Sequence, residues 1–497
     1  MVDRLKVLKY YLYYKYRRPF SDRQALERWQ KKKLKKHMEY VAEHSELYRG
    51  MRSLEEYPVA DKSFMMEHFD ALNTVGIKRE DAEAFAVRAE RDRNFVPKLQ
   101  GVTVGLSSGT SGRRGIFLVS DEEKVRWAGY ILAKFLPGSI LGSYDIAFFM
   151  RADSNLYQAV SSKNIRFHFF DIYRDMDEHK KQLEAQKPDI LVGQPSLLLM
   201  LAAEMERGKL HISPRIVISI AEVLEREDEV YLKKVFRQEM IHQVYQCTEG
   251  CLAATCSHGT LHLNEDIVRI EREYLDTCRF IPIVTDFERK AQPVIRCRLN
   301  DILVERKAPC GCSSPFLALE KIEGREDDMF SFLDEQGKEK MIFPDFIRRC
   351  VLFAAGDEPV EEHGIRTPED STAEENGIRT PEDSTAEENG IRTLEDSTAE
   401  ENGIRTLEDS AAEEHGKYSP EHRTMEYRIV QKPDRSIMVY ADFGDEERAR
   451  VRREFEKLAG DRKLVLPKIT FAPYYRETGK KLKRVACERK RGQEKGE

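Results

Sequence analysis

The sequence contains no long apolar run, because no stretch approaches the ~18 residues of a membrane-spanning helix. Residues 1–6 have neither the apolar stretch nor the small-residue cleavage site of a secretory signal. Cysteine is scarce: the 497 residues include nine, clustered rather than spread as a disulfide framework. These absences argue against a membrane-spanning protein and against a small disulfide-stapled one. We therefore expect a cytoplasmic protein with two or three domains.

Negative charge is concentrated in one short tandem repeat. A 13-residue unit begins at Gly364 and Gly377, and variants with Leu in place of Pro begin at Gly390 and Gly403. Residues 361–415 hold 18 Asp/Glu and four Arg, so the remaining chain carries +8 although the whole carries −6. The unit has too little apolar surface to form a core, and we expect a disordered bystander rather than an acidic docking segment. The mildly basic remainder suits an anionic small molecule and is too diffuse to indicate nucleic acid.

Residues 1–95 are rich in charged and aromatic side chains, and their pattern predicts mostly helix. Within them, residues 9–18 combine tyrosines with basic residues, a pattern that could contact a membrane surface or nucleic acid. We favour the other interpretation, in which a helix packs its tyrosines on the next domain.

From residue 96 to 326, apolar strand-like segments alternate with amphipathic helical patterns, which predicts an α/β core with a largely parallel sheet. Residues 327–485 change to shorter strands and two helices, which predicts a small α+β domain interrupted by the repeat. Residues 486–497 form a basic tail. The clearest segments of the core are the strands 144–150, 189–192 and 215–220 and the helices 195–205 and 227–238.

The most informative segment is Ser-Ser-Gly-Thr-Ser-Gly-Arg-Arg-Gly at 107–115. It lies between two strand-like segments, 102–106 and 116–119, so we expect a hairpin with a mobile turn. Its glycines let backbone N–H groups approach phosphate oxygens, its hydroxyls donate hydrogen bonds, and Arg113 and Arg114 add positive charge. It is not a Walker loop, because no Gly-Lys-Ser/Thr follows. Taken alone, the segment is also explained as a flexible Gly/Ser turn.

Four further motifs follow along the chain. Tyr-Gln-Cys-Thr-Glu-Gly at 245–250 offers an aromatic face, a hydroxyl and a carboxylate, the groups that stack a purine, contact a phosphate and hold Mg²⁺. A carboxylate, Asp301, ends the segment 293–301 and could take ribose hydroxyls. The others are Glu-Gly-Arg-Glu-Asp-Asp at 323–328 and Gly-Lys-Lys-Leu-Lys-Arg at 479–484. Singly, each has an ordinary interpretation as a buried aromatic residue, a strand-end cap, a charged turn or a solvated basic tail.

Together, in this order and at these separations, the five motifs resemble those of the adenylate-forming (AMP-binding) superfamily of acyl-CoA ligases. The resemblance is greatest to the phenylacetate–CoA ligase branch and its deazaflavin-coenzyme-adenylating, coenzyme F synthetase-related members. It covers residues 95–345 well and the C-terminal part more loosely, and it leaves the N-terminal helical region unexplained. It implies a large adenylate-forming α/β domain, a small mobile α+β domain, and the use of ATP and Mg²⁺.

The resemblance implies that the loop covers the β- and γ-phosphates of ATP and that Ala221 and Glu222 line the adenine. The loop departs from the family, which usually has Pro-Lys-Gly where this chain has Arg113-Arg114-Gly115. Arginine keeps the charge but changes its reach and geometry. The loop residues assigned to the nucleotide in this way are Ser107, Ser108, Gly109, Thr110, Ser111, Gly112, Arg114 and Gly115.

The family's remaining nucleotide contacts fall on the next two motifs. By resemblance, Tyr245 would stack on the adenine, Thr248 would contact the α-phosphate and Glu249 would ligate Mg²⁺. Asp301 would bind the ribose hydroxyls, with support from Arg325.

The C-terminal motifs would serve the movement of the small domain. Asp327 would be the hinge about which the small domain rotates, and Lys480 or Lys481 would reach the reacting α-phosphate. The doubled lysine leaves two alignments open, because Lys480 directly follows the glycine whereas Lys481 fits the family's Lys-x-x-Arg spacing.

A Cys/His cluster is a separate candidate for a metal site. Cys256, His262, Cys310 and Cys312 offer a Cys₃His set for a structural Zn²⁺, with His258 as an alternative ligand. The spacing is not that of a standard zinc knuckle, although members of the resembled branch carry similar positions. Buried free cysteines are the competing interpretation.

The leading hypothesis is an ATP-dependent ligase that activates a carboxylic acid as acyl-AMP, releases pyrophosphate and passes the acyl group to CoA or another thiol. The alternatives are AMP transfer alone, formation of an amide or a carrier-protein thioester, and a catalytically inactive nucleotide-binding regulator. The identity of the acid stays open. Candidates for lining its pocket are Phe148, Phe149, Arg151, Asn155, Tyr157 and Gln194.

Overall fold

The computed structural model describes residues 4–16, 20–107, 114–150, 153, 160–352, 354, 426–476 and 482–488. They belong to one compact unit of the chain, formed by Met1–Ala355 and Glu426–Glu497. The repeat at 361–415 lies outside the described residues. Among the helices that are described, none combines the length and the apolar character needed to cross a membrane.

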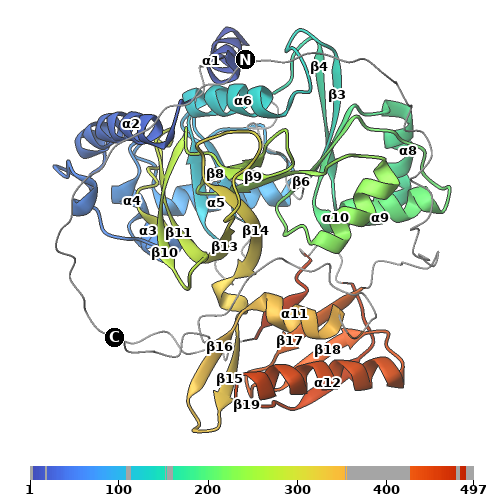
Figure 1. The fold of residues 1–497 in the computed structure, drawn as a ribbon. Coiled ribbons are helices and arrows are strands. Elements are labelled where there is room, and N and C mark those ends of the chain that lie inside the picture. The colour runs from blue at the N-terminus through green and yellow to red at the C-terminus, as the bar shows by residue number, and fades with distance from the viewer. Residues whose placement is uncertain are drawn as a thin grey trace, which may run out of the picture. The chain divides into compact units, whose positions relative to one another are not determined.

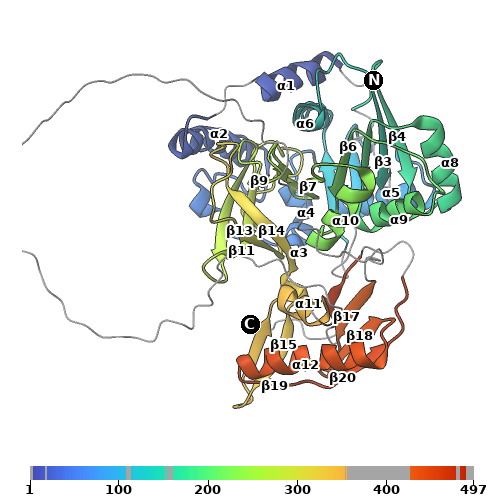
Figure 2. The same cartoon turned by 45° about the vertical axis from the view of Figure 1, so that its right-hand side comes forward.

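The N-terminal region is helical, and its first helix packs against a later one. Helix α1 (Arg4–Tyr16) lies beside α6 (Asp121–Phe135) in both views of the fold (Figures 1 and 2). Tyr11 is buried there, and the Tyr14 ring meets Tyr130 edge-on at 4.8 Å. The tyrosines thus pack on the following region, as we favoured. The other helices here are α2 (Arg23–His44), α3 (Lys62–Glu67), α4 (Phe69–Leu72) and α5 (Arg79–Arg91), with a 3₁₀ turn at Leu54–Glu56.

Strands β1 (Thr103–Leu106) and β2 (Ile116–Val119) pair antiparallel on either side of the loop. The predicted hairpin is therefore confirmed. Residues 108–113 at its turn lie outside the described residues. The two strands pack on α5, so the ends of the loop rest on a rigid support.

A large mixed sheet forms the core, and its first half is parallel. The strands in spatial order are β4 (Ile165–Asp171), β3 (Tyr144–Met150), β5 (Ile190–Gly193), β6 (Ile216–Ile220) and β7 (His242–Cys247). Three helices alternate with them along the chain: α8 (Met176–Gln186), α9 (Pro195–Glu206) and α10 (Arg226–Phe236). Leucines of α9 and Phe236 of α10 pack with Leu191 and Val217 in one buried cluster. This half confirms the predicted alternation of strands and helices.

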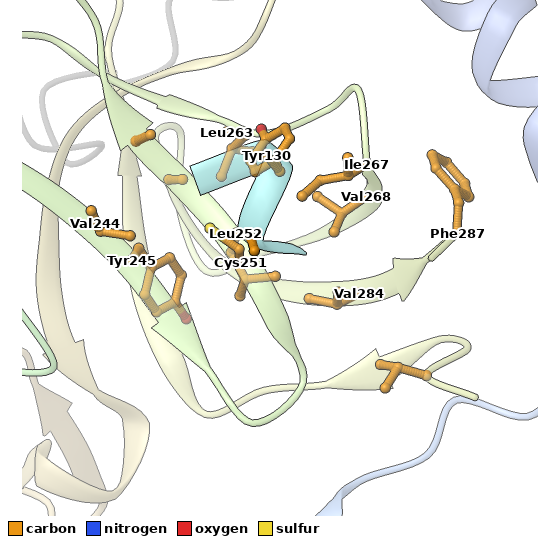
Figure 3. Close-up of a cluster of buried hydrophobic side chains, with 14 of the residues drawn as sticks. Tyr130, Val244, Tyr245, Cys251, Leu252, Leu263, Ile267, Val268, Val284 and Phe287 are labelled. Carbon is orange, nitrogen blue, oxygen red and sulfur yellow. The ribbon is translucent and has the colours of Figure 1, made fainter. Parts of the chain in front are cut away.

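The second half of the sheet is antiparallel, so the prediction of a largely parallel sheet was wrong there. From β7 onward, many connections are tight turns, such as Thr248–Glu249, rather than crossover helices, and short turns can join only antiparallel neighbours. Figure 3 shows the core around Tyr130, Cys251 and Val284, in which Tyr130 of α6 packs in one cluster with side chains of this half. Its strands are β8 (Gly250–Thr255), β9 (Leu261–Leu263), β14 (Ala318–Arg325), β13 (Asp301–Glu305), β11 (Arg279–Asp286) and β10 (Val268–Tyr274), with β12 (Cys297–Arg298) beside β11.

The C-terminal region has the smaller α+β character expected from the sequence. It begins after a 3₁₀ turn at Glu326–Asp328. One small sheet contains β16 (Glu339–Ile342), β15 (Phe330–Asp334) and β19 (Leu464–Val465). A second contains β20 (Ile469–Ala472), β18 (Ile437–Ala441), β17 (Tyr427–Gln431) and β21 (Val485–Cys487), and the helices are α11 (Pro344–Leu352) and α12 (Asp445–Asp461).

Candidate active site

A cleft of about 2180 Å³ gathers residues from each of the five motifs that carry the resemblance. Its walls come from the loop hairpin, from the ends of the sheet strands and from the start of the C-terminal region. Ser108 to Gly112, Lys480 and Lys481 lie outside the described residues. The predicted residues that line the cleft are Ser107, Arg114, Gly115, Ala221, Glu222, Tyr245, Thr248, Glu249, Asp301, Arg325 and Asp327.

The two ends of the loop are fastened to each other. The Ser107 amide donates to the Gly115 carbonyl at 2.7 Å, and the Gly115 amide donates to the Ser107 hydroxyl at 2.8 Å. Arg114 forms a two-point ion pair with Glu90 of α5, one contact at 2.6 Å, and its Nε donates to the Ser107 carbonyl at 3.0 Å. In this structure Arg114 therefore braces the base of the loop, and Glu90 neutralises the charge that we expected to face a polyphosphate.

Three motif residues from three different strands form one polar chain. The Tyr245 hydroxyl donates to Asp301 Oδ2 at 2.5 Å, and Arg325 Nε lies 3.3 Å from Asp301 Oδ1. Asp301 and Arg325 are direct partners in the β13–β14 register. Burial and the nearby Asp301 carboxylate raise the pKa of Tyr245 well above its usual value, so the phenol stays a hydrogen-bond donor. One residue earlier, Asn300 Nδ2 donates to Asp327 Oδ2 at 2.7 Å, which joins the hinge candidate to the same wall.

Glu249 lies in the turn after β7 and is 8% exposed. Lys62 Nζ lies 3.2 Å from Glu249 Oε1 and donates to the Thr248 hydroxyl at 3.3 Å. Burial opposes ionisation of Glu249, but the Lys62 ammonium and the hydrogen bonds from Thr248 and Cys247 outweigh it and lower the pKa of Glu249. Sequence reasoning missed Lys62, because it lies in the N-terminal region that no motif covers.

The Ala221–Glu222 turn at the end of β6 joins the cleft to the C-terminal region. Ala221 has a φ of +65°, a left-handed conformation that is uncommon outside glycine. Glu222 accepts from the Ser196 amide at 3.1 Å through Oε2 and from the Leu482 amide at 3.0 Å through Oε1. The segment after Lys480 and Lys481 is thus held against the turn that was predicted to line the adenine.

Two further ion pairs anchor this C-terminal segment. Lys483 Nζ lies 2.7 Å from Asp328 Oδ1, and Arg484 makes a two-point pair with Asp228 of α10 at 2.5 and 2.9 Å. The Asp228 side chain is 3% exposed, so the pair is largely desolvated. Removing one partner of such a pair would leave a buried charge without a counter-ion, which is strongly destabilising. No sequence motif pointed to Asp228, and Asp328 lies in the motif at 323–328 without having been given a role.

The cleft continues into an apolar part beside α6. Phe148 and Gln194, both predicted to line an acid pocket, border the cleft. The prediction for Phe149 was wrong: it points to the other side of the sheet, where it stacks on Phe170 at 4.5 Å. Arg151, Asn155 and Tyr157 lie outside the described residues. Further apolar lining comes from Tyr130, Phe135, Ile146, Phe167 and Val192.

Asp286, at the end of β11, borders the cleft and is 4% exposed. Burial raises the pKa of its carboxyl from 3.8 to about 7. The folded state therefore binds more protons than the unfolded state between these values, and the free energy of unfolding falls as pH rises from about 4 to about 7.

Asp286→Asn should remove this loss of stability, which is worth about 4 kcal/mol at most. We expect the variant's thermal midpoint to exceed the wild-type midpoint increasingly from pH 4.5 to 7.5. Equal midpoint differences across that range would contradict the shifted pKa.

The four predicted metal-ligand residues come together in space. The ligand atoms of Cys256, His262, Cys310 and Cys312 all lie within 4.8 Å of one another. Cys256 Sγ is 3.7 Å from Cys310 Sγ, and His262 Nε2 is 3.4 Å from Cys312 Sγ. His262 Nδ1 lies 3.0 Å from the Phe316 carbonyl, an arrangement that leaves Nε2 to face the thiols. His258, the alternative ligand, is not part of this group.

The chain consists of a large sheet-and-helix region and a smaller α+β region, and residues of both line the cleft. Two solved structures of 2-hydroxyisobutyryl-CoA ligase in the postadenylation state share this fold. The complex with 2-HIB-AMP has a TM-score of 0.59, and the complex with R3-HIB-AMP has 0.57. In both, 14% of residues are identical, over 96% of this chain and 92% of the other. No family model and no curated protein sequence matches the chain. The likeness is therefore one of fold, and it confirms the fold that the motifs predicted.

Proposed function

We propose that this protein is an ATP-dependent ligase that activates a carboxylic acid as acyl-AMP and then transfers the acyl group to a thiol such as CoA. One observation carries the proposal: the motif groups for adenine, ribose and phosphate converge on a single cleft in a chain with the ligase fold. Motifs that are far apart in the sequence would rarely meet at one cleft by chance.

The described residues suit the first half-reaction. Tyr245 and the Ala221–Glu222 turn offer an aromatic face and a strand end for the adenine, and Asp301 offers carboxylate oxygens to the ribose hydroxyls. Thr248 presents a hydroxyl where the α-phosphate would lie. Attack by the acid's carboxylate builds negative charge on that phosphate and on departing pyrophosphate, so donors already fixed around it lower the barrier.

Glu249 fits the role of a Mg²⁺ ligand. It is an ionised carboxylate in the wall of the cleft, and its neighbour Thr248 supplies a second hard oxygen. Bound Mg²⁺ would neutralise charge on the phosphates. Around it, Lys62 and the Thr248 hydroxyl hold the carboxylate in place, and the two ends of the loop, Ser107 and Gly115, are bonded to each other at the wall of the same cleft.

The apolar part of the cleft supports an acid with an aromatic or aliphatic body, and the branch nearest in sequence pattern takes phenylacetate. The alternatives are AMP transfer alone, amide or carrier-protein thioester formation, and an inactive regulator. The intact Tyr245–Asp301–Arg325 chain and the ionised Glu249 weigh against an inactive regulator.

The test is acid-dependent release of pyrophosphate by the full chain with Mg-ATP, across a panel of aromatic and fatty acids. Each acid is assayed with and without CoA, and products are separated to detect acyl-AMP, acyl-CoA and ADP. We expect pyrophosphate and acyl-AMP with a subset of the acids. Release of ADP and phosphate instead would refute an adenylating enzyme, and acyl-AMP that never becomes acyl-CoA would favour the alternatives.

We propose in addition that the Cys₃His group binds a structural Zn²⁺. Three thiols and an imidazole whose ligand atoms lie within 4.8 Å of one another offer the donor set of a tetrahedral structural zinc site, and four protein ligands would leave no open position for catalysis. The cluster joins the β8–β9 turn to the segment before β14, so zinc would tie these neighbours together.

Protein purified without added zinc should contain about one zinc per chain. Cys310→Ser should lower both the zinc content and the thermal midpoint, because one ligand is lost and the two segments are no longer tied. The matched control is Cys487→Ser, a half-buried thiol outside the cluster, which should leave the zinc content unchanged. Metal analysis and thermal unfolding decide this, and a zinc-free wild-type protein of unchanged stability would refute the site.

A further inference from the structure

Lys62 is a cation of the cleft that no recognised motif contains. It lies at the first position of α3, whose N-cap residue Asp61 accepts from the Phe64 amide at 2.8 Å. Its ammonium lies 3.2 Å from Glu249 Oε1 and 3.3 Å from the Thr248 hydroxyl. A lysine ammonium has three donors, and these contacts use two of them. Its side chain is 37% exposed and borders the cleft, so a third contact to a ligand is open to it.

The backbone places Lys62 there by long-range pairing. Ala60 bridges to Cys297 of β12: its amide donates to the Arg296 carbonyl at 3.1 Å, and the Arg298 amide donates to its carbonyl at 2.7 Å. Arg296 Nη1 also donates to the Tyr57 carbonyl at 3.1 Å. The segment before α3 is thus fastened to the segment that leads to Asp301. The lysine is therefore held on a rigid element rather than on a free loop.

Lys62 also meets the phosphate loop. A Cβ added at Gly115 would lie 2.4 Å from Lys62 Cε, so the lysine stem passes directly over the glycine that ends the loop. The ammonium therefore stands between the base of the loop and the Thr248–Glu249 turn. These are the two elements that the proposed function assigns to the phosphates of ATP.

We propose that Lys62 is a phosphate-binding residue of the adenylation site, donating to the α-phosphate of the nucleotide beside Thr248. This inference rests on the proposed function in assigning the cleft to a nucleotide. A phosphate oxygen that accepts from the Thr248 hydroxyl lies next to the Lys62 ammonium, since the two groups are already in contact. Before the nucleotide binds, Lys62 neutralises Glu249, and a lysine suits this double role because its charge is compact and its stem flexible.

The assignment gives the N-terminal helical region a part in the chemistry. Arg114 is paired with Glu90, so it does not supply a free charge to the nucleotide in this structure. Lys62 brings a positive charge to the same place from a different part of the chain. The family's loop carries a lysine in Pro-Lys-Gly that this chain lacks. Lys62 of α3 would supply a lysine cation in its place.

The experiment compares the affinities of the full chain for AMP and for adenosine by calorimetry, and KM for the acid is measured alongside them. Lys62→Met keeps the stem over Gly115 and removes the charge, so we expect AMP affinity to fall about tenfold, the loss of one charge-assisted hydrogen bond. Adenosine affinity should change less than twofold. Lys62→Arg should recover part of the AMP affinity. The control Lys35→Met removes an exposed lysine paired within α2 and should match the wild type.

The outcomes separate this inference from the proposed function. Equal losses for AMP and adenosine in Lys62→Met, or no loss for AMP, would overturn the role of Lys62 even if the wild type makes acyl-AMP. Selective loss of AMP affinity in a protein that shows no acid-dependent pyrophosphate release would support Lys62 and refute the ligase. If the wild type binds AMP no better than adenosine, the phosphate site itself is refuted. A rise in KM for the acid alone, with AMP affinity unchanged, would assign Lys62 to the acid's carboxylate and overturn the proposal.

Discussion

Glu249→Gln is expected to lower acid-dependent pyrophosphate release by about a hundredfold or more, while the protein stays folded. Glutamine keeps the size of the side chain but removes the charge that faces Lys62 at 3.2 Å and that would hold Mg²⁺. Loss of one fixed electrostatic group at a reacting centre costs about 10²–10³ in rate. The measurement is the steady-state rate of pyrophosphate release with the best acid of the panel, over a range of Mg²⁺ concentrations.

The control for this variant is Glu273→Gln. Glu273 also pairs with a cation, Arg298, but its side chain is 43% exposed and does not border the cleft. Exposed pairs of this kind contribute about 0–1 kcal/mol, so the control should keep both activity and thermal midpoint. A Glu249→Gln enzyme with wild-type rate at every Mg²⁺ concentration would remove Glu249 from the catalytic site.

Replacing Lys480 and Lys481 together by alanine is expected to abolish acyl-AMP formation and to spare thioester formation from supplied acyl-AMP. The reason lies in the segment that follows them. The Leu482 amide donates a hydrogen bond to Glu222, and Arg484 forms an ion pair with Asp228. These contacts hold residues 482–484 near the Ala221–Glu222 turn and α10, and in the proposed function a lysine just before them would stabilise the charge that develops on the α-phosphate. The two half-reactions are measured separately, as acyl-AMP formed in one turnover and as acyl-CoA made from added acyl-AMP.

Asp327→Pro is the complementary variant. Proline fixes φ near −65°, so a hinge at Asp327 would be held in one state and the proposed rotation of the small domain would be hindered. We expect acyl-AMP to form and thioester formation to be lost, the reverse of the double lysine variant. Equal loss of both half-reactions in both variants would contradict a rotating small domain. The single variants Lys480→Ala and Lys481→Ala then identify which lysine acts.

Local patterns in the sequence located the elements that carry the site. The strands at 144–150, 189–192 and 215–220 are found as β3, β5 and β6, and the loop lies in the hairpin that its flanking strands predict. Apolar periodicity and the placement of glycines determine secondary structure over a few residues, so strands and turns can be predicted directly from the sequence. The same alternation should have excluded Phe149, since neighbouring residues of a strand face opposite sides and Phe148 already faced the cleft.

Pairing between distant segments was not readable in this way. Three features depend on contacts between segments that are distant in the sequence. They are the antiparallel half of the sheet, the Arg114–Glu90 pair and the Arg484–Asp228 pair. The spacing of residues along the chain does not specify such long-range contacts, because they follow from the combined burial of many apolar faces.

The sequence by itself thus determined which chemical groups line the proposed nucleotide cleft: Tyr245, Thr248, Glu249, Asp301 and Arg325, with the hydroxyl of Ser107 and the glycine Gly115. Only the tertiary structure decided how their charges are balanced. In the folded chain Arg114 pairs with Glu90, and Lys62 of the N-terminal helices pairs with Glu249, which lies 187 positions later in the sequence. The physical reason is that a charge in a cleft must find a partner in space. That partner is set by the packing of whole elements rather than by its neighbours in sequence.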